Sequence, residues 1–305
     1  MFRFDFSVRT LRKLNQGGEV ISSVDMSKYS TFKCGGRAKV LVIVKTLEGF
    51  VKVTKYLKDK SIEYFVIGAG SNILVSDKGY SGVVLKLSGD LARIESTGDN
   101  IIEVGAGVKL SKIFAYTSSN NLSGLEDGAG IPATIGGAVY MNASAYNYET
   151  AKLVEYVVAY LDGKLTYFDK DACKFSYRHS VFQDNGAIIV RVGLKFKPLN
   201  KQDIMQRFNE VSKMRAASQP LNKPSAGCVF KKVEGIEVSK CLDLMGLKGL
   251  TVGDAQVSIK HANFIINLGE AKAQDIYKLI SLIQTKFEEK YNILLETEIK
   301  FLGEF

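Results

Sequence analysis

The segment that most constrains how this chain folds is residues 122–143, which read Leu-Ser-Gly-Leu-Glu-Asp-Gly-Ala-Gly-Ile-Pro-Ala-Thr-Ile-Gly-Gly-Ala-Val-Tyr-Met-Asn-Ala. Its five glycines stand among small or apolar residues, and no charged residue follows Asp127. Because glycine has no Cβ, its main chain can approach another group closely, and pyrophosphate oxygens are a common ligand of such backbone. The segment predicts either a phosphate-bearing ligand held by backbone or a tight corner between packed elements.

Two further Gly-Ala-Gly turns, at residues 68–70 and 105–107, accompany this segment. The first continues as Ser71 and Asn72, whose hydroxyl and amide groups add donors suited to a phosphate. A dinucleotide-binding Rossmann turn would need a third small residue and then a helix, but residues 73–76 are branched, apolar and strand-like, so that motif is excluded. Taken alone, residues 68–72 are equally well explained as a hairpin corner. Together, the three turns indicate an extended ligand that carries phosphates.

The length of 305 residues predicts two or three domains. A formal net charge of +9 favours an anionic partner, but the basic residues are spread along the chain without dense runs interleaved with aromatics. We therefore expect small phosphorylated ligands rather than nucleic acid.

The four cysteines are widely separated and the only histidines are His179 and His261, so no metal-ligand spacing can be assembled. We expect reduced thiols and no metal site. The N-terminal sequence interrupts its apolar residues with charge, and apolar runs elsewhere are short. These features predict neither a secretory signal nor a membrane span, and hence a cytoplasmic protein.

Hydrophobic periodicity predicts a chain that mixes helices and strands. From residue 201 onward the pattern changes, and we expect a separate α+β domain there. The predicted strands are residues 40–44, 64–67, 73–76, 82–87, 101–104, 154–161, 187–196, 263–267 and 294–302; the predicted helices lie around Leu11, after a cap at Thr46, and at residues 110–116, 203–216, 238–245 and 273–291.

Three residues could do chemistry, although spacing alone singles out none of them. Arg178 is by default a surface charge or a structural ion pair, Cys228 a buried small hydrophobe, and Glu298 a solvent-facing carboxylate on a terminal strand.

Seven ordered motifs give a more specific signal. The chain resembles the UDP-N-acetylenolpyruvoylglucosamine reductases, flavoenzymes of peptidoglycan precursor synthesis, from near residue 30 to its end. The length and the direct run from Arg178 to the Pro224 loop are similar to the shorter, second type of the family. The matching stretches are residues 31–36 (TFKCGG), 68–77 (GAGSNILVSD), 128–143 (GAGIPATIGGAVYMNA), 175–180 (FSYRHS), 224–231 (PSAGCVFK), 249–258 (GLTVGDAQVS) and 295–303 (LETEIKFLG).

The resemblance implies an α+β fold. It would consist of a two-subdomain FAD-binding module of the vanillyl-alcohol-oxidase type followed by an α+β substrate domain. The implied boundaries are residues 1–85 and 86–200 for the two FAD-binding subdomains and 201–305 for the substrate-binding domain.

The resemblance also implies that FAD is bound and that NADPH reduces it before the enolpyruvyl substrate takes the same space. Residues near the two glycine-rich segments would hold the FAD. The implied cofactor residues are Ile67, Gly68, Ala69, Gly70, Ser71, Asn72, Gly128, Gly130, Ile131, Pro132, Gly136, Gly137 and Asn142, and the implied substrate contacts are Tyr177, Lys231 and His261.

Catalytic roles come from the same resemblance. Hydride addition to an enol ether puts negative charge next to the substrate carboxylate, and Arg178 would stabilise that charge. Glu298 would assist polarisation or proton relay. Cys228 stands where the family usually has a serine, and its thiol would donate the final proton.

Two other functions remain open from the residues. Another FAD-dependent oxidoreductase on the same scaffold would explain the glycine turns but not the motifs at residues 224–231 and 295–303. A non-catalytic nucleotide-binding module would explain the charge and the turns but leaves Arg178, Cys228 and Glu298 unexplained. In either case we expect a monomer.

Overall fold

The computed structural model describes residues 7–305, so the first six residues of the N-terminal sequence considered above lie outside it. The described chain divides into two compact units. Unit 1 comprises the described residues up to Ser22, Val40–Ala69 and Gly82–Ser212, and unit 2 comprises Ser23–Lys39, Gly70–Ser81 and Lys213–Phe305. Each unit has its own hydrophobic core. The predicted boundaries at residues 85 and 200 stay a prediction.

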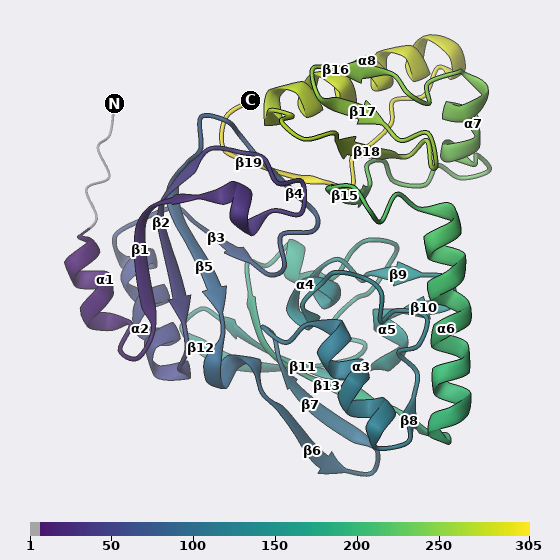
Figure 1. The fold of residues 1–305 in the computed structure, drawn as a ribbon. Coiled ribbons are helices and arrows are strands. Elements are labelled where there is room, and N and C mark those ends of the chain that lie inside the picture. Colours follow the sequence, from purple (N-terminus) through teal and green to yellow (C-terminus); the bar gives the residue numbers. More distant parts are fainter. Residues whose placement is uncertain (1–6) are drawn as a thin grey trace. The chain divides into compact units, whose positions relative to one another are not determined.

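The larger sheet of unit 1 has five antiparallel strands in the order β12-β11-β13-β7-β6. The short helix α4 packs against β7 and β13. The long helix α6 stands to the right of α3 and α5 in Figure 1. Phe114 of α3 stacks on Phe208 of α6, with ring centroids 4.5 Å apart. Two short strand pairs, β9 with β10 and β8 with β14, accompany this sheet. The helices and strands of this part of the chain are β6 (Ile94–Gly98), β7 (Ile101–Gly105), α3 (Leu110–Ser119), β8 (Leu122–Ser123), α4 (Ile135–Tyr140), β9 (Ser144–Ala145), β10 (Tyr148–Glu149), α5 (Thr150–Leu153), β11 (Val154–Leu161), β12 (Lys164–Asp169), η3 (Val181–Gln183), β13 (Ile188–Lys195), β14 (Lys197–Pro198) and α6 (Lys201–Ser218).

A second sheet has the order β1-β2-β5-β3, and its strands β1, β2 and β5 each run from one unit into the other. Helix α2 begins where predicted, because the Thr46 side chain accepts a hydrogen bond from the Gly49 N–H. Its Phe50, Val53 and Leu57 are fully buried at helical spacing. These elements are α1 (Val8–Leu14), β1 (Glu19–Asp25), β2 (Arg37–Val44), α2 (Leu47–Asp59), β3 (Tyr64–Ile67), β5 (Tyr80–Leu87) and η2 (Gly89–Ala92).

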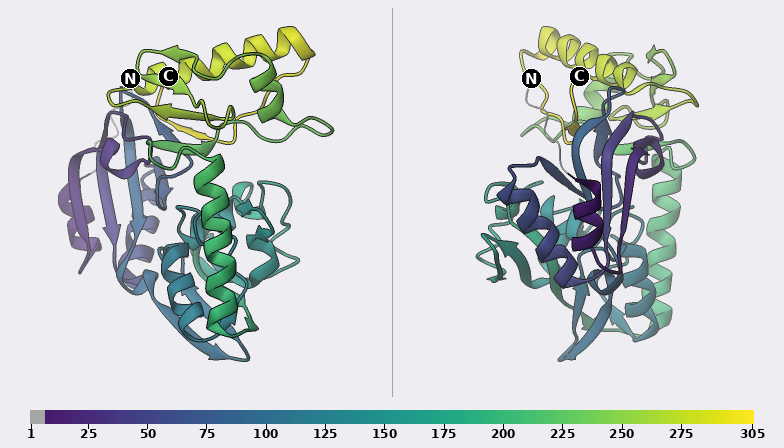
Figure 2. Two further views of the ribbon diagram at one scale, coloured as in Figure 1. Left: turned by 45° about the vertical axis from the view of Figure 1, so that its right-hand side comes forward. Right: turned by 90° about the vertical axis from the view of Figure 1, so that its left-hand side faces the viewer.

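Unit 2 contains a four-stranded sheet in the order β15-β18-β17-β16, and helix α8 lies over it in Figures 1 and 2. The apolar residues Ile276, Leu279, Ile280, Ile283 and Phe287 of α8 are all buried. Strands β4 and β19, from distant parts of the chain, form a parallel pair. These elements are η1 (Met26–Tyr29), β4 (Ile73–Val75), β15 (Ser225–Cys228), α7 (Val238–Leu244), β16 (Thr251–Val252), β17 (Ala255–Val257), β18 (Phe264–Asn267), α8 (Ala273–Tyr291) and β19 (Lys300–Leu302).

The last strand is shorter than predicted. The prediction extended it over residues 294–302, but β19 covers only Lys300–Leu302. Residues 296–298 instead make an irregular contact with residues 229–231, in which Phe230 and Thr297 form an isolated bridge. Glu298 therefore lies just before the strand rather than on it.

Within residues 7–305, no helix is long and apolar enough to cross a membrane. Over the same residues, no cluster of three or more His, Cys, Asp and Glu side chains has the arrangement of a metal site.

Candidate functional site

The glycine-rich segment meets the other two glycine turns inside unit 1. Thr134 caps α4, and its hydroxyl accepts a hydrogen bond from the Gly137 N–H at 3.3 Å. Gly68 lies against this threonine so closely that a Cβ at Gly68 would collide with the Thr134 Oγ1. The Gly136 N–H donates to the Ala106 carbonyl of the 105–107 turn at 3.0 Å. The three turns that sequence analysis grouped by composition therefore lie side by side.

Close packing explains some of these glycines, whereas the ligand explanation stays a prediction for the others. A Cβ at Gly128 would enter the Tyr148 ring, and one at Gly136 would meet Ala106, so these two glycines form tight corners. At Gly137, in contrast, a Cβ would meet only the Thr134 Oγ1, at 3.6 Å. Space for another group therefore remains beside the main chain at Gly137, although its N–H already donates to Thr134.

A positive charge that the sequence analysis missed lies at the same place. The half-buried Lys86 donates from its Nζ to the Gly68 carbonyl at 2.9 Å. Burial, followed by the nearby charge of Lys109, lowers the pKa of Lys86. The signal was present in the sequence, because Lys86 interrupts the apolar strand Val-Val-Leu-Lys-Leu.

These residues fit the pyrophosphate of the implied FAD. Open glycine backbone, the Thr134 hydroxyl and two ammonium groups, on Lys86 and Lys109, form a donor set for an anion. The predicted cofactor residues belong to both units. Ile67, Gly68, Ala69, Gly128, Gly130, Ile131, Pro132, Gly136, Gly137 and Asn142 are in unit 1, and Gly70, Ser71 and Asn72 are in unit 2.

Arg178 lies in unit 1, at the tip of a tight turn. Ser176 and His179 exchange both backbone hydrogen bonds, each 3.1 Å, which leaves Tyr177 and Arg178 as the two central residues. Arg178 has a left-handed backbone with φ of 55°. Such a conformation costs a non-glycine residue about 1–2 kcal/mol and persists where surrounding contacts hold it.

The Arg178 side chain is directed to the β9–β10 hairpin. One guanidinium nitrogen donates to the Ser144 Oγ at 2.7 Å and the other to the Ser144 carbonyl at 3.4 Å. The guanidinium carbon also lies 5.2 Å from the centroid of the Tyr177 ring. Two predicted site residues, Tyr177 and Arg178, are therefore in contact with each other.

Cys228 and Glu298 lie on adjacent segments of unit 2. The Glu298 N–H donates to the Val229 carbonyl at 2.7 Å, and the Lys231 N–H donates to the Glu296 carbonyl at 2.9 Å. Cys228 is half-buried. In contrast, burial raises the pKa of both Cys34 and Cys173 to about 12, so those thiols keep their protons and are unreactive.

Asn72 also contacts the Glu298 segment. Its side-chain amide donates to the Glu298 carbonyl at 3.0 Å, and its own carbonyl accepts from the Lys300 N–H at 3.0 Å. The predicted cofactor ligand therefore holds the backbone beside a predicted catalytic carboxylate.

The other two predicted substrate residues of unit 2 have partners within the protein. Lys231 forms an ion pair with Glu296 at 2.8 Å. Burial, with the charge of Lys248 next, lowers the pKa of His261, so its ring is neutral near pH 7. The His261 Nδ1 accepts from the Asn263 N–H at 3.3 Å. Asn263 in turn bonds both backbone groups of Phe230, each at 2.9 Å, and so connects His261 to the Cys228 strand.

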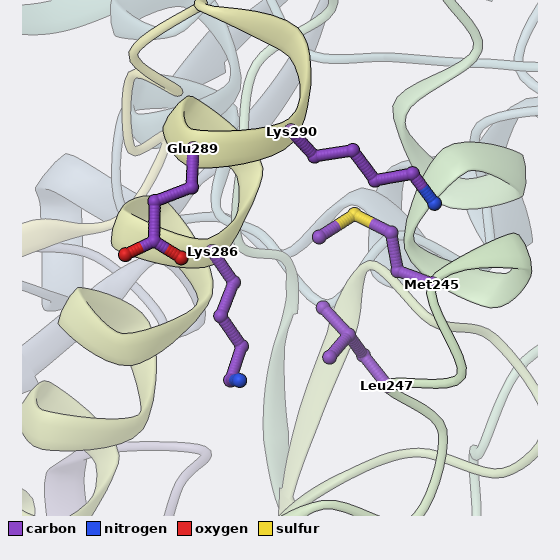
Figure 3. Close-up of a pocket in the computed structure, with 5 residues that line it drawn as sticks. All are labelled: Met245, Leu247, Lys286, Glu289 and Lys290. Atoms are coloured by element: carbon purple, nitrogen blue, oxygen red, sulfur yellow. The ribbon is translucent and has the colours of Figure 1, made fainter.

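A shallow hollow of about 310 Å³ lies elsewhere in unit 2, between the end of α7 and helix α8 (Figure 3). Its lining residues are Met245, Leu247, Lys286, Glu289 and Lys290. None of these five belongs to the predicted site.

Comparisons with known proteins identify relatives over nearly the whole chain. A family model described as FAD binding domain matches residues 38–165, and one described as UDP-N-acetylenolpyruvoylglucosamine reductase, C-terminal domain, matches residues 219–302. The chain is 40% identical to UDP-N-acetylenolpyruvoylglucosamine reductase of Syntrophomonas wolfei, over 99% of this chain and 98% of the relative. It is 41% identical to the protein of the same name from Caldicellulosiruptor bescii, over 95% of this chain and 93% of the relative.

The fold is similar to a solved structure of the same kind. The crystal structure of UDP-N-acetylenolpyruvylglucosamine reductase from Thermus caldophilus superimposes with a TM-score of 0.83 and 37% identity, covering 94% of this chain and 100% of that chain. The predicted fold class is thus confirmed as α+β, with an FAD-binding domain followed by the family's C-terminal domain.

Proposed function

Since this chain belongs to the UDP-N-acetylenolpyruvoylglucosamine reductase family, we propose that Arg178, Cys228 and Glu298 are its catalytic residues. It is an FAD-dependent oxidoreductase of peptidoglycan precursor synthesis, which reduces UDP-N-acetylglucosamine enolpyruvate to UDP-N-acetylmuramate with NADPH. Membership of this family decides against the two other functions that the sequence left open.

The observation that carries the residue proposal is the contact between residues 229–231, which directly follow Cys228, and residues 296–298. It brings the residue that follows the half-buried Cys228 into hydrogen-bond contact with the backbone of Glu298, although the two segments are distant in the sequence. A thiol and a carboxylate carried by adjoining segments suit a site that must deliver a proton.

Each side chain has a distinct task. When bound, FAD supplies the hydride that NADPH has given it. Arg178 binds the substrate carboxylate and stabilises the negative charge that develops next to it, because a guanidinium is always charged and can bind two oxygens. The Cys228 Sγ donates a proton to the carbon that carries this charge, and Glu298 assists through polarisation or proton relay.

Most of the remaining assignments follow from the same family, whereas Lys86 and Lys109 are added from the structure. The glycine backbone around Gly68 and Gly137, with Lys86 and Lys109, holds the FAD pyrophosphate; Tyr177, Lys231 and His261 contact the substrate. We also propose that the protein acts as a monomer in the cytoplasm, where NADPH and UDP-linked sugars are made. Light scattering during size-exclusion chromatography tests the monomer.

An anaerobic half-reaction experiment tests the proposal. The bound flavin is reduced with NADPH, the UDP-linked enolpyruvate is added, and reoxidation is followed by absorbance. The wild-type protein is expected to reoxidise. Cys228→Ser is expected to keep substantial turnover, because a hydroxyl can also donate a proton. Cys228→Ala is expected to slow reoxidation about 10²–10⁴-fold while NADPH still reduces the flavin. If alanine leaves both half-reactions intact, the proton-donor assignment is wrong.

A further inference from the structure

The Asn142 side chain, which the sequence placed among the cofactor ligands, is used entirely within the protein. Asn142 is only 2% exposed. Its amide nitrogen donates to the Glu149 Oε1 at 2.8 Å and to the Ser176 carbonyl at 2.9 Å. Its amide oxygen accepts from the Ala151 N–H at 3.1 Å. A primary amide has two N–H donors, and both are occupied by these contacts.

The first of these contacts reaches the hairpin that receives the arginine side chain. Glu149 of β10 pairs directly with Ser144 of β9. Ser144 is the residue whose hydroxyl and carbonyl accept the Arg178 guanidinium. Asn142 therefore anchors the acceptor end of the arginine.

The second contact reaches the backbone that carries the arginine. Ser176 begins the turn that ends at His179, with Arg178 in its left-handed conformation between them. The turn has a further support in Gln183, whose amide donates to the carbonyls of Arg178 and Tyr140, each at 2.9 Å. Asn142 thus bonds both the backbone of the turn and the hairpin that the guanidinium reaches.

We propose that Asn142 is a positioning residue for Arg178, which sets the orientation of the guanidinium through Ser176 and Glu149. This inference rests on the proposed catalytic role of Arg178. It assigns the Asn142 side chain to the reduction of the substrate rather than to binding of the cofactor. Because Arg178 has a strained backbone, a loss of support at Ser176 is expected to displace it, and small displacements of a charged group are costly in catalysis.

The test uses Asn142→Gly, because glycine accepts the left-handed φ of 41° at this position and the change removes the side chain with its amide without straining the backbone. The matched control is Asn100→Gly, at another left-handed asparagine of unit 1 that is exposed. Both are measured for FAD content, FAD affinity, flavin reduction by NADPH and anaerobic reoxidation by the UDP-linked enolpyruvate. A flavin difference spectrum on adding substrate to the oxidised protein reports binding separately.

Asn142→Gly is expected to slow reoxidation on the order of 10–10²-fold. FAD content, FAD affinity and reduction by NADPH should stay within about twofold of wild type, since in this inference the amide acts only through Arg178. The control should match wild type in every measurement. In an Arg178→Ala background, Asn142→Gly should add almost no further loss, because the two residues act through one interaction.

Other outcomes overturn the inference. Loss of FAD together with both half-reactions would make Asn142 a cofactor residue, and an unchanged reoxidation rate would give it no catalytic role. If Arg178→Ala is impaired while Asn142→Gly is not, only the inference fails; if Arg178→Ala itself reoxidises normally, the proposed function fails too. Should Asn142→Gly not fold, Ser144→Ala removes the hydroxyl that accepts the shorter of the two guanidinium bonds, and normal reoxidation in that variant would also contradict the inference.

Discussion

The two units hold their predicted catalytic residues in different ways. In unit 1, the strained turn of Arg178 is closed by two backbone hydrogen bonds between Ser176 and His179, but it is fixed to its surroundings by the side chains of Asn142, Gln183 and Ser144. In unit 2, the segments of Cys228 and Glu298 are joined mainly by backbone hydrogen bonds. Backbone bonds do not depend on residue type. The comparison therefore teaches that orientation in unit 1 is sensitive to single substitutions, whereas in unit 2 it is tolerant of them.

Within unit 1, the largest effect is expected at Arg178. Arg178→Ala should slow reoxidation of the reduced flavin by about 10²–10³-fold, the loss typical when one charge-stabilising donor is removed. Rapid-mixing absorbance measures it. Arg178→Gly should be equally inactive but about 1 kcal/mol more stable than the alanine variant, because only glycine accepts φ of 55° without strain. If the two variants have equal free energies of unfolding in urea, the backbone at residue 178 is not strained, and strain does not distinguish the two units.

A smaller effect is expected at Asp127, at the start of the glycine-rich segment. Asp127 accepts two bonds from the Arg207 guanidinium, at 2.7 and 2.8 Å, and one from the Asn147 N–H at 3.1 Å. Asp127→Asn should lower the melting temperature at pH 7 by about 2–4 °C. Arg207→Lys, which keeps a charge but not the paired geometry, should lie between this variant and wild type.

The loss of stability in Asp127→Asn is also expected to depend on pH. Burial alone would raise the pKa of Asp127, but the hydrogen bonds from Arg207 and Asn147 outweigh it, and the pKa is lowered from 3.8. Since the folded pKa is depressed, the stabilisation is fully present above the ordinary value of 3.8 and is lost as pH falls through the lower folded value. The melting-temperature difference between wild type and Asp127→Asn should be constant from pH 7 to about 5 and should narrow below pH 3.8. A difference that narrows at neutral pH contradicts this assignment.

In unit 2, the N-terminal end of helix α8 is held by a carboxylate, as Asp127 holds the glycine-rich segment in unit 1, but this carboxylate does not contact the predicted catalytic residues. Asp77 caps α8 from outside the helix, accepting from the Ala273 and Gln274 N–H groups at 3.0 and 2.9 Å. Asp77→Ala should cost about 1 kcal/mol of unfolding free energy, as loss of a helix cap usually does. Half-reaction rates at 25 °C should not change; a specific loss of reoxidation would show that unit 2 is as sensitive as unit 1.

The smallest effect is expected for an exposed ion pair of unit 1. Lys58 and Asp162 are 2.8 Å apart, with side chains 67% and 78% exposed. Solvent screens such pairs, so Lys58→Ala should leave the melting temperature within about 1 °C of wild type. A clear drop in the melting temperature would mean that unit 1 is sensitive to single substitutions throughout and not only around Arg178.

Much of the fold could be predicted from the sequence, because the spacing of apolar residues along a helix or strand shows which of its faces is buried. Helix α8 has the predicted bounds, and α2 begins at the predicted cap. Helix α4 was missed, since two of its six residues are glycines, which disfavour helix. The N-cap Thr134 and packing on β13 override that preference.

The site could be predicted only in part, because residue type does not identify a distant partner. The glycine segment, Arg178, Cys228 and Glu298 were singled out by motif. Asn142 and Asn72 were predicted as cofactor residues, and the sequence did not show that their amides bond the carbonyls of Ser176 and Glu298, 34 and 226 residues away. Lys86 was missed for the same reason, since only the fold brings its ammonium group to the Gly68 carbonyl.

The parallel pair of β4 and β19 limits how this protein can be divided. Unit 2 is assembled from three separate stretches of chain, and its core includes Phe32 and Leu74 as well as residues after 213. A fragment cut from residue 213 to the C-terminus would lack the strand that β19 pairs with and the Asp77 carboxylate that caps α8. Such a fragment would expose apolar surface that the whole chain buries, so the C-terminal region is not a module that can be expressed or exchanged alone.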